Sequence, residues 1–168
     1  MPDLPIVVVM GVSGTGKTTI GRRLAAELRV PFAEGDDFHP PANVAKMSAG
    51  TPLDDADRLP WLDALGAWAR ARAGFGGVIS ASALKRAYRD RLRAAAPRCV
   101  FLHLDGDRGL IQRRMAERKG HFMPPALLDS QCAALEPLEP DEKGAPIDIA
   151  GSPKETTALA LEALQRIT

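Results

Sequence analysis

The chain has 168 residues and a formal net charge of +1, with 45% hydrophobic and 26% charged residues. This length and composition predict one globular domain spanning 1–168, and the near-neutral charge argues against nucleic acid or an anionic membrane as partner. The first apolar run, 6–10, is too short for a signal peptide or a membrane span, and two cysteines make no disulfide framework, so we expect a cytoplasmic protein.

Apolar runs alternate along the chain with segments of helical periodicity. The expected strands are 6–10, 30–34, 78–81, 99–104 and 147–149. The expected helices lie around 20–28, 61–68, 84–92, 110–115, 125–135 and 153–167. Strands alternating with helices predict an α/β fold, in which a parallel sheet is covered by helices on both faces.

The most specific local pattern follows the first strand. It fits the phosphate-binding loop G-x-x-x-x-G-K-[ST] at every fixed position and lies between a strand and a helix, as that loop requires. The run is Gly11, Val12, Ser13, Gly14, Thr15, Gly16, Lys17 and Thr18. Its N–H groups and the helix N-terminus would bind phosphates, Lys17 would neutralise the outer ones, and the Thr18 hydroxyl would be a Mg²⁺ ligand.

A phosphate-binding loop leaves kinases, ATPases and GTPases open. The chain contains no Asn-Lys-x-Asp guanine signature, and Asp141-x-x-Gly144 lies in a polar loop instead of after an apolar strand, which disfavours a GTPase. The size of the chain disfavours a large ATPase motor. A small kinase is therefore the favoured class.

Phosphoryl transfer also needs carboxylates near the metal and the acceptor. Asp36 follows a predicted strand and Gly35, which places it beyond the carboxyl end of that strand, beside the loop. We expect it to orient or deprotonate the acceptor hydroxyl, or to hold metal-bound water. Asp105 ends another apolar run and resembles a metal-binding aspartate, but a helix cap at Asp105 or Asp107 is the preferred interpretation.

Further blocks make the chain resemble the bacterial gluconate kinases, small P-loop kinases related to shikimate and nucleoside monophosphate kinases. These blocks are the loop preceded by Met10, Gly35-Asp36 with His39-Pro40, Asn43 with Lys46-Met47, Gly50-x-Pro52-Leu53-x-Asp55-x-Asp57-Arg58-x-Pro60-Trp61-Leu62, Ser82-Ala83-Leu84-Lys85 with Tyr88-Arg89, Arg118-Lys119-Gly120-His121-Phe122, and Gln131 before Leu135-Glu136-Pro137. The blocks after the loop are more specific than the loop itself. One departs from the family: Gln131-Cys132-Ala133-Ala134-Leu135 stands where Gln-Phe-Glu-Thr-Leu is usual, so a polar role there is lost.

The resemblance implies transfer of the ATP γ-phosphate to the 6-hydroxyl of D-gluconate, with ATP and Mg²⁺ as cofactors. It also implies a three-layer P-loop kinase fold with a five-stranded parallel sheet, a mobile lid at roughly 114–130, and a homodimer. Another small anionic acceptor such as shikimate, or a module that senses ATP without turnover, remains as an alternative.

The resemblance and the chemistry of phosphoryl transfer together give a set of expected site residues. The expected catalytic residues are Lys17, Asp36 and Arg118, with Thr18 and Asp36 at the metal and Arg114 joining the loop in nucleotide binding. The expected substrate-binding residues are Asp36, His39, Arg58, Lys85, Arg89 and His121, while Lys119 is a further lid cation.

Each of these residues also has a purely structural interpretation. His39 could cap a turn, Arg58 could pair with neighbouring aspartates, and lid arginines could be helix C-terminal charges. Lys85 and Arg89 lie one turn apart and are expected to share a substrate-facing side. Arg86 and Arg93 are expected on the solvated helix surface, and Trp61 and Trp68 are expected in the core.

Overall fold

The computed structural model describes residues 4–117 and 125–168, and its centre is a parallel sheet of five strands in the order β2-β3-β1-β4-β5. The strands are β1 (Leu4–Met10), β2 (Phe32–Glu34), β3 (Phe75–Ser80), β4 (Val100–Asp105) and β5 (Gly144–Asp148). The helices are α1 (Lys17–Leu28), the 3₁₀ helix η1 (Gly35–Phe38), α2 (Pro41–Ser48), α3 (Asp55–Ala71), α4 (Arg86–Ala95), α5 (Arg108–Glu117), α6 (Pro125–Ala134) and α7 (Pro153–Ile167). The expected α/β class and parallel sheet are confirmed.

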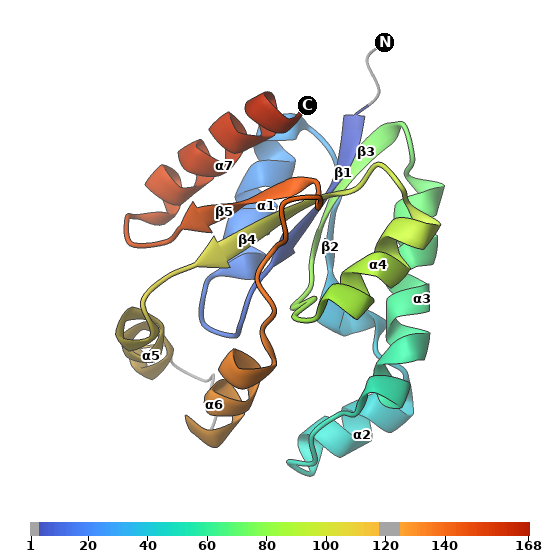
Figure 1. The fold of residues 1–168 in the computed structure, drawn as a ribbon, viewed down its shortest axis with the longest axis vertical. Coiled ribbons are helices and arrows are strands. Elements are labelled where there is room, and N and C mark those ends of the chain that lie inside the picture. Colours follow the sequence, from blue (N-terminus) through green and yellow to red (C-terminus); the bar gives the residue numbers. More distant parts are fainter. Residues whose placement is uncertain (1–3, 118–124) are drawn as a thin grey trace.

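Side chains of β1 alternate between two hydrophobic cores, one on each face of the sheet. Val7 and Val9 face the core shared with α1 and α7, whereas Ile6, Val8 and Met10 face the core shared with α3 and α4. Figure 1 shows these two pairs of helices on opposite sides of the strands. Because both faces are covered, β1 is apolar throughout its buried part, as is typical of a central parallel strand.

Several strand boundaries differ from the predicted ones. β3 begins at Phe75, so Gly76 and Gly77 belong to the strand, which the sequence predicted to start at 78. A Cβ atom at Gly77 would lie 2.7 Å from the Trp68 ring, so glycine there lets α3 pack closely against the sheet. β5 likewise begins at Gly144, before the predicted 147–149.

The short helix α2 is not among the expected helices, since consecutive prolines at 40 and 41 are typical of a turn instead of a helix interior. Pro41 occupies the first turn of the helix, where no intrahelical N–H bond is lost. With η1, this helix fills the connection between β2 and α3. Among the described residues, no helix combines the length and apolar character needed to cross a membrane.

The strands are parallel, so their carboxyl ends share one edge of the sheet, which faces left and downward in Figure 1, where α2, α5 and α6 also lie. The phosphate-binding loop leaves β1 at this edge, between β3 and β4. Ligands of open α/β sheets bind beyond the carboxyl ends of the strands, so the fold places the candidate site here.

Candidate active site

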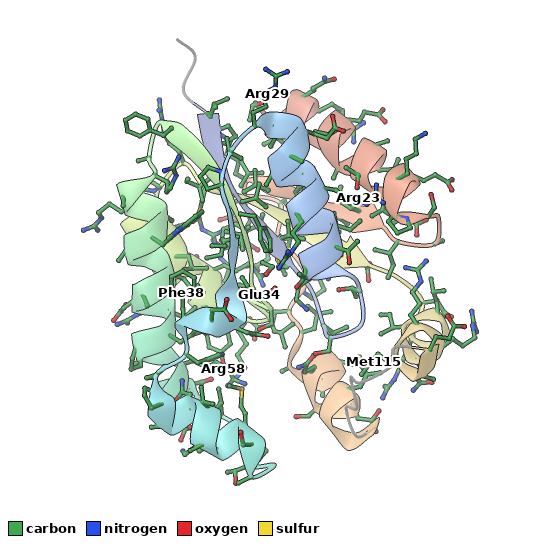
Figure 2. The ribbon with its side chains drawn as sticks, turned by 180° about the vertical axis from the view of Figure 1, so that it is seen from behind. Arg23, Arg29, Glu34, Phe38, Arg58 and Met115 are labelled. Atoms are coloured by element: carbon green, nitrogen blue, oxygen red, sulfur yellow. The ribbon has the colours of Figure 1, made fainter. Side chains whose placement is uncertain are left out.

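The phosphate-binding loop, residues 11–18, joins β1 to α1. Gly14 and Gly16 have φ values of 85° and 91°, in the left-handed region that favours glycine. A Cβ atom at Gly14 would lie 2.4 Å from Cγ of Met115, so glycine also admits α5 against the loop (Figure 2). The Thr15 hydroxyl and the Lys17 ammonium both donate to the Val12 carbonyl, at 2.9 and 3.0 Å. The loop is thus held open in the shape that phosphate binding requires.

Glu34, the last residue of β2, lies against the start of α1 (Figure 2). Its carboxylate accepts hydrogen bonds from the Thr18 hydroxyl and, at 2.7 Å, from the Ser80 hydroxyl. The structure therefore brings Glu34 to the expected metal ligand Thr18. The sequence interpretation missed this residue, although its position at the end of a strand was the signal used to select Asp36.

Asp36 lies two residues further on, in η1, and its side chain is exposed. The segment around it is fixed, because the Trp61 indole donates a hydrogen bond of 2.8 Å to the Gly35 carbonyl. Gly35 also packs tightly against β3, since a Cβ atom there would lie 2.0 Å from the Ser80 carbonyl oxygen. Trp61 is buried in the core, as expected. Asp36 is consequently an exposed carboxylate on a rigid base beside Glu34.

His39 stacks on Trp61, with ring centroids 4.6 Å apart and an interplanar angle of 10°. Its Nδ1 lies 3.2 Å from Nδ2 of Asn43, which fixes the ring from α2. Burial lowers the pKa of His39, an effect that the nearby Asp36 carboxylate opposes. The structure thus holds the imidazole in place close to Asp36.

Arg58 and Lys85, on different elements, meet at the ring of Tyr88. The Arg58 guanidinium donates to the Tyr88 hydroxyl at 3.2 Å and to the Leu53 carbonyl at 2.8 Å. The Nζ atom of Lys85 lies 3.2 Å from Oδ1 of Asp55. The Tyr88 hydroxyl donates to the same Asp55 carboxylate. We call Asp55, Arg58, Lys85 and Tyr88 the acceptor cluster. Asp55 and Tyr88 belong to quoted motif blocks but were given no role from the sequence.

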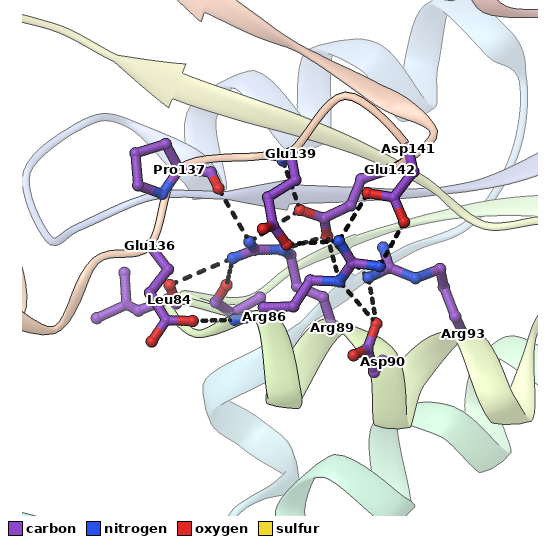
Figure 3. A network of polar contacts seen from close by, with 11 residues as sticks. Leu84, Arg86, Arg89, Asp90, Arg93, Glu136, Pro137, Glu139, Asp141 and Glu142 are labelled. Carbon is purple, nitrogen blue, oxygen red and sulfur yellow. Dashed lines mark hydrogen bonds and ion pairs between the residues drawn. The ribbon is translucent and has the colours of Figure 1, made fainter.

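Arg89 does not join this cluster, and the expectation that it shares a substrate-facing side with Lys85 is wrong in this structure. Its side chain has no exposed area, and Glu142, equally buried, accepts from its Nε and Nη2 at 2.7 and 3.0 Å (Figure 3). It also donates to the carbonyls of Ala83 and Leu84. Lys85 precedes α4 as its N-cap, whereas Arg89 lies inside the helix and points to the loop before β5.

Arg86 and Arg93 are partly exposed on α4, with 29% and 19% of their side-chain surface accessible, but carboxylates bind both of them. Arg86 binds Asp141 through both Nη atoms at 2.8 Å and Asp90 through Nε at 3.0 Å (Figure 3). Arg93 donates to Glu142 at 2.8 Å. With Arg89, these residues tie α4 to the segment 136–142.

A cavity of about 280 Å³ opens beside residues 14–16 of the phosphate-binding loop. Its lining residues are Gly14, Thr15, Gly16, Thr19, Ile20, Arg114, Gly151, Ser152, Pro153 and Thr156. Arg114 spans it, donating to the Gly151 carbonyl at 3.1 Å. Its size is close to the lower end of small-molecule sites, about 300–1,000 Å³. Arg114 was expected to join nucleotide binding from the lid, whereas Ser152 and Pro153 were given no part in the site and form the N-cap and first residue of α7.

The remaining sequence-predicted residues divide into two groups. Arg118, Lys119 and His121, with positions 118–124 of the lid expected at 114–130, lie outside the described residues. Asp105 ends β4 and is exposed, while the Asp107 carboxylate accepts from the Leu110 N–H and caps α5. Within the described ranges, no cluster of three or more His, Cys, Asp or Glu side chains could hold a metal.

The chain is similar to known proteins over most of its length. A family profile described as an AAA domain matches residues 6–138. A gluconokinase of Gluconobacter oxydans (strain 621H) is 53% identical over 138 residues, covering 81% of this chain and 78% of the relative. The chain belongs to the gluconokinase family. A thermosensitive gluconokinase of Escherichia coli (strain K12) is 51% identical, covering 81% of this chain and 74% of the relative.

The fold agrees with the family as well. The crystal structure of a gluconokinase from Sinorhizobium meliloti 1021 superposes with a TM-score of 0.92 at 43% identity, covering 99% of this chain and 95% of that one. The match confirms the P-loop kinase fold expected from the gluconate kinase resemblance. The profile match includes the phosphate-binding loop and the acceptor cluster, whereas Gly151 and Ser152 lie beyond it.

Proposed function

We propose that this chain transfers the γ-phosphate of ATP to the 6-hydroxyl of D-gluconate, giving 6-phospho-D-gluconate and ADP. The observation that carries the proposal is the position of the acceptor cluster at the same sheet edge as the phosphate-binding loop, in a chain of the gluconokinase family. A sugar-acid kinase requires a loop that binds phosphates and cationic side chains that bind the substrate carboxylate.

On the donor side, the cavity beside Arg114 is the proposed site of the ATP base. The phosphates would then extend along the loop N–H groups toward Lys17, whose ammonium is anchored on the Val12 carbonyl. A cation held in this position neutralises charge that develops on the transferred group. Arg118 and His121 are proposed to act from the lid on sequence grounds.

The residues beside Thr18 fit a Mg²⁺ ion. The Thr18 hydroxyl and the Glu34 carboxylate supply oxygen atoms, the ligand type that Mg²⁺ prefers, and a site with few protein ligands suits a cation that keeps its waters. Asp36 stays a proposed member of this shell. When bound, the ion would neutralise negative charge on the nucleotide phosphates.

On the acceptor side, Lys85 and Arg58 are proposed to bind the gluconate carboxylate, and His39 to bind a hydroxyl group. The two cations already converge on Tyr88, so little side-chain reorganisation is needed to clamp one anion. Asp36 is proposed to orient the 6-hydroxyl or accept its proton. Arg89 is withdrawn from the substrate-binding set because its guanidinium is buried against Glu142.

The decisive experiment measures ADP release with D-gluconate, shikimate, AMP or water as the only acceptor. We expect a large rate with gluconate and little release with water, since lid closure would exclude the competing solvent. Equal release with and without gluconate would instead make the chain an ATPase, and a shikimate-dependent rate would change the acceptor.

Two further proposals rest on the family resemblance and not on a described contact. We propose that the protein is a homodimer, which light scattering coupled to size-exclusion chromatography would test by its mass relative to the 18.0 kDa chain. We also propose a cytoplasmic location, which cell fractionation would test.

A further inference from the structure

The imidazole of His39 is held by two buried side chains. Its ring stacks on Trp61, a core residue of α3. Its Nδ1 atom lies 3.2 Å from Nδ2 of Asn43, a residue of α2 that is almost fully buried. The stacking fixes the plane of the ring, and the contact with Asn43 fixes which edge of the ring faces α2.

The orientation of the Asn43 amide is decided by a second partner. The same Nδ2 atom donates a hydrogen bond of 2.8 Å to the backbone carbonyl of Asp57, in the first turn of α3. A carbonyl oxygen can only accept, so the group that faces it must be the NH₂ of the amide and not the amide oxygen. One amide proton is therefore directed at Asp57 and the other at His39.

Asp57 is itself held in place from two helices. Its N–H donates to the Asp54 carboxylate at 2.7 Å, and its own carboxylate accepts from the Asp54 N–H at 3.0 Å, which completes the capping box of α3. Lys46 of α2 donates to the Asp57 carboxylate at 2.8 Å. Because Asn43 and Lys46 both join α2 to Asp57, the Asn43 amide cannot turn over without losing the contact with the Asp57 carbonyl.

These contacts determine which nitrogen of His39 carries the proton. An Nδ1 atom that accepts from the Asn43 amide has no proton of its own, so the proton of the uncharged ring lies on Nε2. Burial also lowers the pKa of His39, an effect that the Asp36 carboxylate opposes and the Arg58 guanidinium strengthens. The imidazole is therefore a hydrogen-bond donor at its Nε2 atom.

The Nε2 edge of the ring is the part that can bind a ligand. His39 is partly exposed, and no group within residues 4–117 and 125–168 forms a hydrogen bond with its Nε2 atom. The charged side chains that act on the ring are Asp36 and Arg58, two of the residues proposed to contact gluconate. An N–H donor among these residues suits the hydroxyl oxygens of a polyol, which accept hydrogen bonds.

We propose that Asn43 is a positioning residue that holds His39 in its Nε2–H form, so that His39 donates a hydrogen bond to an oxygen atom of gluconate. The inference rests on the proposed function and gives it a direction, since His39 serves as a donor and not as an acceptor. Asn43 belongs to one of the motif blocks but was given no role from the sequence.

The proton on Nε2 excludes His39 as the base of the transfer. When the 6-hydroxyl oxygen bonds to the γ-phosphorus and the bond from this phosphorus to the ADP oxygen breaks, the hydroxyl proton must pass to an acceptor. Nε2 already carries a proton and Nδ1 is engaged by Asn43, so His39 offers no free lone pair. The proton is left to a carboxylate, and Asp36 is the one proposed to lie at this hydroxyl.

The tautomer can be measured directly and without substrate. Long-range ¹H–¹⁵N correlation NMR of histidine-labelled protein distinguishes a ring nitrogen that carries a proton from one that does not. The chain has three histidines, and the His39 signals are identified by their absence from the spectrum of His39→Gln. We expect the proton on Nε2 in the wild type and on Nδ1 in Asn43→Asp, whose carboxylate can only accept.

Kinetic measurements test the donor role of Nε2. His39→Gln keeps an N–H donor near the position of Nε2, so its kcat and gluconate KM should stay close to those of the wild type. His39→Met removes the donor and should raise the gluconate KM by about 3–10-fold with little change in kcat, the effect of one hydrogen bond between neutral groups. A base at this position would instead make both variants lose about 10²–10⁴-fold in kcat.

A double-mutant cycle separates positioning from a merely structural role of Asn43. At a pH at which the spectra show an uncharged ring, Asn43→Asp alone should raise the gluconate KM by about 3–10-fold, because Nε2 no longer donates. Added to His39→Met, it should raise the KM no further, since its effect passes through the imidazole. Ser48→Ala, at an exposed position of α2, is the control and should leave the KM unchanged.

A proton on Nδ1 of wild-type His39, or an equal effect of Asn43→Asp with and without the imidazole, would overturn the inference. Urea unfolding shows which variants are folded, and if Asn43→Asp is not, the wild-type spectrum and the two His39 variants still decide. Failure of the proposed function has a different signature, namely no gluconate binding or turnover by the wild type. The spectra report the tautomer in that case too, because they need no substrate.

Discussion

The Lys85 ammonium and the Asp55 carboxylate lie 3.2 Å apart across 30 residues, at the junction of α3 and α4. Asp55 also accepts from the Tyr88 hydroxyl, and this bond and the Lys85 contact lower the pKa of Asp55. The same contact raises the pKa of Lys85, which therefore stays charged at physiological pH. A permanently charged ammonium, already oriented, is suited to hold a substrate carboxylate.

Lys85→Ala should raise the gluconate KM by about 10–100-fold, because a hydrogen bond to a charged group contributes about 1.5–3 kcal/mol. ATP affinity should change little, since Lys85 lies on the acceptor side. Steady-state kinetics and calorimetric titration of each ligand would show this. Arg91→Ala, which removes an exposed ion pair between α4 and Asp63 of α3, is the matched control. Loss of ATP binding with gluconate binding retained would contradict this placement of Lys85.

Lys17→Ala should lower kcat by about 10²–10³-fold, the usual effect of removing a group that stabilises transition-state charge. The loop itself should persist, because the Thr15 hydroxyl still donates to the Val12 carbonyl. Single-turnover measurements of phosphoryl transfer would separate this loss from weaker ATP binding. Arg23→Ala, an exposed cation further along α1, should be silent. A nearly normal single-turnover rate would remove Lys17 from the chemistry.

Glu34→Gln should increase the Mg²⁺ concentration needed for half-maximal activity by about 10–100-fold, the usual cost of losing a residue that orients a metal ligand. The amide keeps the size of the side chain and can still accept a bond from Thr18, so the change reports the lost charge. Titration of Mg²⁺ against initial rate is the measurement. Asp37→Asn, an exposed carboxylate in η1, should leave the Mg²⁺ dependence unchanged. An unaltered requirement in Glu34→Gln would exclude this role.

Asp36→Asn should lower kcat by about 10²–10⁴-fold if the carboxylate is the general base, with little change in affinity for either substrate. If Asp36 mainly holds the metal, high Mg²⁺ should restore part of the rate. A pH–rate profile together with a Mg²⁺ titration distinguishes the two roles. Near-normal turnover would mean that Asp36 only caps a turn, since asparagine caps about as well as aspartate.

Glu142→Gln should destabilise the fold by about 3–5 kcal/mol near neutral pH, because it leaves the Arg89 guanidinium buried without its counter-charge. Burial opposes ionisation of Glu142, but hydrogen bonds from Arg89, the Glu139 N–H and Arg93 outweigh it and lower its pKa from 4.5 to about 2.

The contribution of this carboxylate is therefore complete above pH 4.5 and is lost as the pH falls toward 2. The difference in unfolding free energy between wild type and Glu142→Gln should narrow across that interval. Urea unfolding at several pH values would measure it, with Asp63→Asn, at an exposed pair, as the control. A difference that is independent of pH would mean that ionisation of Glu142 contributes nothing.

The sequence by itself determined the phosphate-binding loop, the α/β class and the family. The loop is a run of consecutive residues whose glycines, lysine and threonine constrain one another locally, so its pattern can be read without knowing the rest of the fold. Apolar runs likewise predicted five strands. The central strands β1, β3 and β4 are apolar because both of their faces are covered, whereas β2 and β5 are only partly buried.

Only the tertiary structure decided which partner each charged side chain has. From the sequence, Arg89 and Lys85 were expected to share one side of a helix, yet the partner of Arg89 is Glu142, 53 residues away. The two residues meet because β5, which follows Glu142, pairs with β4. The partners of Glu34 and Gln131 also depend on the tertiary structure, because the Thr18 hydroxyl and the Ser13 N–H that bind them belong to another segment of the chain. Helical spacing fixes which residues share a face, but the packing of distant segments determines whether that face meets solvent, substrate or an opposite charge.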